Sequence, residues 1–187
     1  MLSEPSHPVM PDPVTIARAI IDGNRYMTLA TADADGRPWA SPVFYAAADY
    51  TEFYWISAPE ATHSQNLAQR PHIAIVIFDS RAAEGEGQAV YMSATAEQVA
   101  AADVGRSLTI YPGPAGLGGP PVTPEQLQAP APYRLYRATA DEQSILCPRG
   151  TGPCQLHGLA YDHRIPVRAV GRPGSASRGA ATRPGTH

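Results

Sequence analysis

Hydrophobic and polar residues follow a β-strand pattern through most of the chain between Tyr26 and Val99. Five segments in this run are rich in the β-branched and aromatic residues that strands favour: 26–32, 38–46, 52–57, 73–78 and 88–96. The sequence Asp33-Ala34-Asp35-Gly36 predicts a tight turn between the first two. The nearly continuous apolar segment at 73–78 predicts a strand buried on both faces.

Helix signals occur at four places: 13–22, 62–69, 97–104 and 123–128. In the first, Asp12 is a suitable N-cap and Pro13 suits the first helical position. The second is expected to end before Pro71, because the residue preceding a proline avoids helical geometry. Few helices among many short strands with short links predict a mainly β fold, an antiparallel sheet that curls or closes.

The later part of the chain differs in composition from the strand-rich run. Residues 105–132 are rich in glycine and proline, and they form either a surface excursion or a lid over a site. Strand-like patterns return at 133–140, 143–148 and 164–170. We therefore expect one domain over 13–170, with an extension at 1–12 and a disordered, low-complexity tail at 171–187.

Composition narrows the possible partners. The chain has 187 residues and a formal net charge of −3, and all its basic residues are arginines. A mildly acidic protein is a poor match for nucleic acid, whose binding needs a basic face. No apolar stretch approaches the roughly 18 residues that cross a bilayer. The N-terminus carries no basic leader, so we expect a cytoplasmic protein without a membrane partner.

The two cysteines, Cys147 and Cys154, are too few for a disulfide framework. Together with His157 and His163 they have the chemistry of zinc ligands, but their spacing matches no familiar zinc pattern. The sequence therefore favours two unpaired thiols in a loop and no metal site.

A proline interrupts the second predicted strand, in the sequence Ser41-Pro42-Val43-Phe44. Because proline cannot donate a ladder hydrogen bond, this strand is predicted to lie at an edge or to bulge. Either arrangement leaves backbone groups free for a flat heterocycle with several carbonyls and ring nitrogens. The alternative is an edge strand without a ligand.

A second candidate site lies where the third strand ends and the next helix begins. Ile56 and Ser57 end the strand, and Thr62, His63 and Ser64 start the helix. Hydroxyls and free backbone N–H groups at a helix N-terminus form an anion site, to which a histidine adds a donor. The alternative is simple capping by Thr62 or Ser64, with His63 facing solvent.

A third candidate is Gln88, at the start of the fifth strand, because its amide can donate to and accept from the edge of a flavin-type ring. Together the three segments resemble the pyridoxamine 5′-phosphate oxidase-like family. The likeness spans about 13–170 and is strongest over 26–99, where the closing sequence SATAEQV also resembles the family's.

The resemblance implies a six-stranded antiparallel split β-barrel with a few short peripheral helices. It further implies a homodimer that binds FMN in a groove between its subunits. The implied cofactor-binding residues are Ser41, Pro42, Val43, Phe44, Ile56, Ser57, Thr62, His63, Ser64 and Gln88. The oxidase proper has an arginine and two lysines where this chain has Ser41, Ala46 and His63, so the resemblance points to another member of the family.

The expected function is a flavin-dependent oxidoreductase that transfers a hydride between FMN, or a deazaflavin, and a small organic substrate. The alternatives are a non-catalytic flavin- or haem-binding protein and a scaffold without ligand. No side chain stands out as a general acid or base. Trp39, Phe44, Tyr45 and Trp55 are expected either to cover the subunit interface or to pack in the core.

Overall fold

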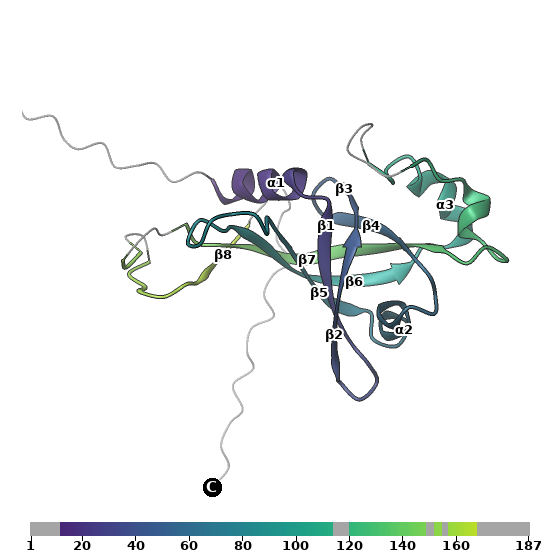
Figure 1. Cartoon of the computed structure of the whole chain (residues 1–187), viewed down its shortest axis with the longest axis horizontal. Helices are drawn as coiled ribbons and strands as arrows, with labels where there is room; N and C mark the ends of the chain where they lie inside the picture. The colour runs from purple at the N-terminus through teal and green to yellow at the C-terminus, as the bar shows by residue number, and fades with distance from the viewer. Residues whose placement is uncertain (1–11, 114–119, 149–151, 155–156, 168–187) are drawn as a thin grey trace, which may run out of the picture.

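The computed structural model describes residues 12–113, 120–148, 152–154 and 157–167. Their strands form one antiparallel sheet, in the order β2-β1-β5-β6-β7-β4-β3, with β8 paired to β7 (Figure 1). The strand bounds are β1 Tyr26–Ala32, β2 Pro38–Phe44, β3 Ala46–Ala48, β4 Glu52–Ser57, β5 His72–Phe78, β6 Ala89–Gln98, β7 Arg134–Leu146 and β8 Arg164–Pro166. The helical elements are α1 Pro13–Gly23, α2 Thr62–Gln69, α3 Ala101–Ser107 and the short 3-10 helix η1 Pro124–Leu127.

A single residue, Tyr45, makes the sheet curl. Strands β2 and β3 stand at opposite ends of the strand order, yet only Tyr45 separates them in the chain. The two ends of the sheet must therefore approach each other, which gives the half-closed barrel expected of a mainly β split barrel. The Tyr45 N–H donates to the Arg25 carbonyl over 3.2 Å, and its hydroxyl donates to the Ile21 carbonyl over 2.6 Å.

The main core lies on one face of β1, β5 and β6, where burial alternates with the two-residue period of a strand. Its largest fully buried side chains include Phe53 and Trp55 on β4, Leu29 on β1 and Ile75 on β5. Helix α1 lies along the sheet and buries Ala17 and Ile21 against it (Figure 1).

The observed strands correct several expectations. The sheet has eight strands rather than six. The expected strand at 38–46 divides at Tyr45 into β2 and β3, whereas 133–140 and 143–148 join into the single strand β7. Strand β5 is not buried on both faces: Ile73, Ile75 and Ile77 are buried and their neighbours are not. An antiparallel sheet packs one face on the core and leaves the other open, and the apolar run conceals this alternation.

The first two helices begin where the sequence predicts, at Pro13 and Thr62. The segment expected at 97–104 forms a helix slightly later, at Ala101–Ser107. The predicted turn at 33–36 is present, with the Gly36 N–H donating to the Asp33 carbonyl over 3.0 Å. Gly36 has a φ of +84°, which explains why this turn needs glycine.

The described part of the glycine- and proline-rich segment is not a loose excursion. Tyr111 and Leu127 are buried in a second hydrophobic cluster with Tyr54 and Leu135 of the sheet. The expected extension at 1–12, apart from Asp12, and the expected tail at 171–187 lie outside the described residues. Within the part that the structure describes, no helix has the length and apolarity needed to cross a membrane.

Candidate functional site

His63 brings two of the predicted segments together. Its Nε2 lies 2.8 Å from the Ser57 Oγ at the end of β4, and its Nδ1 lies 3.2 Å from the Ser41 Oγ on β2. Because His63 is in the first turn of α2, this one side chain connects the helix start to two strands at opposite sides of the curled sheet. The structure therefore brings together three of the residues that the sequence nominated, Ser41, Ser57 and His63.

The Trp39 indole extends this network. Its Nε1–H donates to the Ser41 Oγ over 3.0 Å. The Ser41 hydroxyl proton is then available for His63 Nδ1, which favours the tautomer with its proton on Nε2, facing Ser57. Burial lowers the pKa of His63, so the free imidazole is neutral at neutral pH. His63 does not face solvent unpartnered, as the capping alternative supposed.

The N-terminus of α2 carries free donors. The N-cap is Ala61, and no side-chain cap hydrogen bond is present among the described residues. The first backbone bond of the helix is from the Gln65 N–H to the Ala61 carbonyl. The three preceding N–H groups, at 62–64, have no partner within the helix by its geometry. Capping by Thr62 or Ser64, the alternative for this segment, is therefore absent.

Ser64 adds a second unsatisfied group at the same place. Its side chain is 3% exposed, and its Oγ finds no hydrogen-bond partner among the described residues. Thr62, in contrast, is exposed on the first turn. A buried hydroxyl without a partner is costly, by about 1–3 kcal/mol, unless a ligand or water satisfies it.

Two residues that the sequence did not nominate hold α2 in place. The Asn66 Nδ2 donates to the Thr31 Oγ1 over 3.0 Å, and the Thr31 hydroxyl donates to the Trp39 carbonyl over 3.4 Å. Both side chains are buried, at 5% exposure. An asparagine in the middle of a short helix is the one signal in the sequence that such a network existed.

The remaining residues of the second strand are spread along it. Pro42 is exposed and pairs with Thr28, and β2 pairs only with β1 among the described strands, so the predicted edge position is confirmed. Val43 is buried in the core. Phe44 lies at the far end of the strand, where its ring packs edge-on against Tyr111 with centroids 6.1 Å apart.

Of the other nominated residues, Ile56 is partly buried in the second hydrophobic cluster and Gln88 lies at a distance. Helix α2 leads into β5 at His72, whereas Gln88 precedes Ala89, which pairs with Phe78 at the other end of β5. Ser41, which contacts His63, is level with Ile75 of β5 through Leu29 of β1, so Gln88 lies about 13 Å along the strands and about 14 Å across the sheet from Ser41. One chain therefore does not bring Gln88 to His63. The Gln88 Oε1 finds no partner among the described residues.

The aromatic residues expected at an interface divide into two groups. Trp55 and Tyr45 are buried, at 0% and 6% exposure, so they are core residues. Trp39 is 49% exposed, and Phe44 is partly buried. The fully buried Trp55 stacks on Tyr136, with ring centroids 5.6 Å apart.

Hollows of different size lie near the described sheet, and a small one of about 300 Å³ is lined by Phe44 and Tyr45. A cleft of about 820 Å³ between α1 and strands β5 to β8 contains none of the ten nominated residues. A second hollow, of about 650 Å³, is lined by Ser64 and other residues of α2 and by the end of β6. Of the ten nominated residues, only Ser64 lines this second hollow, and Ser41, Ser57 and His63 line none of these hollows.

Comparison with known proteins agrees with this architecture. A sequence profile described as pyridoxamine 5′-phosphate oxidase matches residues 16–147. A pyridoxine/pyridoxamine 5′-phosphate oxidase from Paraburkholderia phymatum is 42% identical over 52 residues, which cover 28% of this chain and only 24% of that relative.

Solved structures show the same fold at low sequence identity. A haem-binding protein from Mycobacterium smegmatis aligns with a TM-score of 0.60 and 18% identity, over 85% of this chain and 60% of its own. A FAD-binding protein from Mesorhizobium loti aligns with a TM-score of 0.51 and 18% identity, over 68% of this chain and 87% of its own. The profile match covers well over half of the sequence, so the chain belongs to the pyridoxamine 5′-phosphate oxidase family.

Proposed function

We propose that this protein binds FMN with the phosphate at the N-terminus of α2 and acts as a flavin-dependent oxidoreductase on a small organic substrate. One observation carries the proposal: His63 bridges Ser41 and Ser57 beside a helix start that no side chain caps among the described residues. This arrangement places hydroxyls, an imidazole and unsatisfied N–H groups around one point.

The residues at this point fit a phosphate group. The N–H groups at 62–64 and the buried Ser64 Oγ supply donors that lack partners among the described residues. The positive end of the α2 dipole favours an anion there by about 0.3–1 kcal/mol. The hydroxyls of Ser57 and Ser41 can turn from His63 to a ligand, because a serine O–H rotates to suit its partner. The negative charge of a bound phosphate would also favour the protonated, positively charged form of the His63 imidazole.

The cluster holds no arginine or lysine side chain, so hydroxyls and backbone dipoles would do most of the binding. The edge strand β2 would present its backbone at 41–44 to the flavin ring. Bound FMN would supply hydride transfer, and the protein would supply placement and exclusion of water.

The position of Gln88 supports a site shared between two copies. It lies about 13 Å along the strands and about 14 Å across the sheet from Ser41, away from a ring held at Ser41 in the same chain. In a homodimer, Gln88 of a second copy could approach that ring. The exposed Trp39 on the edge strand would then have an apolar partner surface to cover it.

The test compares FMN with riboflavin, which has the same ring and lacks the phosphate. We expect tight binding of FMN and much weaker binding of riboflavin, measured by quenching of flavin fluorescence. Thr62→Glu should abolish the advantage of FMN, because like charges repel at this exposed first-turn position. Thr62→Gln, which matches it in size without the charge, should retain that advantage. Equal binding of the two flavins would remove α2 from consideration.

The absorption spectrum separates the remaining possibilities. If a reduced nicotinamide cofactor bleaches the bound flavin, the protein accepts hydride and an oxidoreductase is favoured. If the bound flavin is not reduced by nicotinamide cofactors, a non-catalytic carrier is favoured. A Soret band in the purified protein would favour haem binding, the function in the name of the Mycobacterium smegmatis protein. A deazaflavin would show in the spectrum of the material released by denaturation. A colourless protein that takes up neither flavin nor haem would leave only the scaffold.

A further inference from the structure

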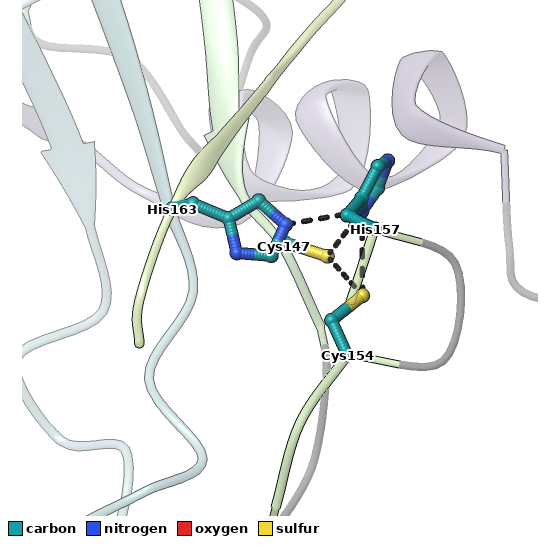
Figure 2. A group of neighbouring side chains, drawn as sticks. All are labelled: Cys147, Cys154, His157 and His163. Carbon is teal, nitrogen blue, oxygen red and sulfur yellow. Dashed lines mark hydrogen bonds between the residues drawn. The ribbon is translucent and has the colours of Figure 1, made fainter. Parts of the chain in front are cut away.

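The end of the sheet opposite α2 holds four side chains that the FMN site does not use. Figure 2 shows Cys147, Cys154, His157 and His163 directed toward one another. Their candidate ligand atoms all lie within 4.8 Å of one another. The spacing along the sequence gave no reason to expect this, and the structure brings the four residues to one point.

The fold places these residues from three sides. Cys147 directly follows β7 and His163 directly precedes β8, and the Cys147 N–H donates to the His163 carbonyl over 2.9 Å. Cys154 and His157 come from the connection between the two strands. The Gly158 N–H donates to the Cys154 carbonyl over 2.7 Å, which turns the chain back so that Cys154 and His157 face the same way. Gly158 has a φ of +68°, a conformation that suits glycine.

Three of the separations match the edges of a tetrahedron. With zinc–sulfur bonds of about 2.3 Å and zinc–nitrogen bonds of about 2.0–2.1 Å, neighbouring ligand atoms lie about 3.3–3.8 Å apart. The two Sγ atoms are 3.6 Å apart, and the His157 Nδ1 lies 3.7 Å from the Cys147 Sγ and 3.3 Å from the Cys154 Sγ. The His163 Nε2 lies 3.0 Å from the His157 Nδ1. These values exceed a disulfide bond length of about 2.05 Å and suit four ligands around one ion.

An outer hydrogen bond orients one of the ligands. The His163 Nδ1 lies 3.1 Å from the Tyr161 carbonyl oxygen, which accepts only, so Nδ1 carries the proton. The lone pair is then on Nε2, the atom that faces the cluster. Metal-binding histidines usually donate their second ring N–H in this way.

We propose that Cys147, Cys154, His157 and His163 form a structural zinc site that fastens the connection between β7 and β8 to the sheet. Four protein ligands leave no open position for a substrate, which distinguishes a structural site from a catalytic one. Binding Zn²⁺ releases the two thiol protons to solvent, and two thiolates balance the charge of the ion. Both cysteines are buried against core residues such as Ile145 and Ile165, so the bound ion would adjoin the hydrophobic core.

The competing explanation is a group of thiols and imidazoles that hydrogen-bond to one another without metal. The test uses the full chain, reduced and freed of metal by a chelator, and titrated with Zn²⁺ or Co²⁺. We expect one ion per chain, protection of both thiols from a thiol reagent, and the intense visible bands of tetrahedral cobalt with thiolate charge transfer. Absence of uptake by the reduced protein, or a weak octahedral cobalt spectrum, would overturn the proposal.

Variants assign the ligands. Loss of an outer partner alone lowers metal affinity by about 10–100-fold, so Cys154→Ser and His163→Asn should lower zinc affinity by more than about 100-fold. The matched control is His72→Asn, an exposed histidine on β5 outside the cluster, which should bind zinc as the wild type does. If a variant fails to fold, the cobalt spectrum of the wild type still decides. Zinc affinity unchanged in both ligand variants would contradict the assignment.

Discussion

The Asn66 side chain donates a hydrogen bond to the Thr31 Oγ1 over 3.0 Å, and both groups are buried between α2 and β1. This pair fixes the helix whose first turn carries His63. Its strength therefore bears on both stability and the geometry of the proposed phosphate site.

A double-mutant cycle measures the pair. Thr31→Val leaves the Asn66 amide buried without its partner and is expected to lower the free energy of unfolding by about 1–3 kcal/mol. Asn66→Ala should also destabilise, and the coupling of the two changes should be about 0.5–1.5 kcal/mol, measured by urea denaturation. Thr28→Val, on the same strand outside this network, is the control and should cost less. Strictly additive effects would show that the bond contributes nothing.

The pH dependence of stability should carry a signature of His63. Burial depresses the pKa of its imidazole below the unfolded value of 6.5, so the unfolded chain binds the proton first. The contribution of this histidine to the free energy of unfolding is fully present well above pH 6.5. It declines as the pH falls from there through the lower, folded-state pKa. His63→Gln should lose this part of the decline. The free energy of unfolding, measured at several pH values in this range, should therefore fall more steeply with decreasing pH for the wild type than for the variant. Equal slopes for the two proteins would contradict the expectation.

Mixed dimers test whether each FMN site uses two chains. Homodimers of Thr62→Glu and of Gln88→Ala should both bind FMN poorly. In a mixed dimer, the first chain supplies an intact Gln88 and the second supplies an intact α2, so one site of the two regains every wild-type residue. We expect FMN binding to recover to about half of the wild-type capacity. If Gln88 serves its own chain, every site keeps one defect and mixing restores nothing.

The exposed Trp39 tests the proposed homodimer directly. Its indole is 49% exposed on the edge strand β2, where a second copy could cover it. If the proposed dimer forms through this strand, Trp39→Asp should convert it to a monomer in sedimentation experiments, because it places a charge in an apolar contact. Trp39→Phe retains an apolar ring and should remain dimeric. A wild-type protein that sediments as a monomer would refute the shared site as well.

Two truncations separate the sheet from the residues after it. The Val167 N–H donates to the Gln143 carbonyl over 2.9 Å, and Ile165 is buried, so β8 belongs to the core. Truncation after Val170 should leave the melting temperature and FMN binding unchanged. Truncation after Asp162 removes β8 and His163, and it should lower the melting temperature and abolish zinc binding. Loss of folded protein on the shorter deletion would show that residues after Val170 are structural.

Much of the fold follows from local pattern. Strands β1 and β4 have the bounds that their β-branched and aromatic residues predict, and helix α2 ends before Pro71 as expected. The edge position of β2 follows from Pro42, because a proline cannot complete an interior ladder. Ser41, Ser57 and His63 were nominated from hydroxyls and a histidine at element ends, and they meet in space.

Other features depend on contacts between distant segments. The alternating burial of β5 was hidden by an apolar run, since the sequence does not reveal which face meets the core. Asn66 and Thr31 are 35 residues apart, and only the docking of α2 on β1 makes them partners.

The sequence by itself determined the strand and helix segments, the curled β class and the residue types available for chemistry, because these depend on neighbours within a few positions. Only the tertiary structure decided that Cys147, Cys154, His157 and His163 converge, and that Gln88 lies far from His63. Strand register and the path of connecting loops set such distances, and both arise from the packing of the whole chain.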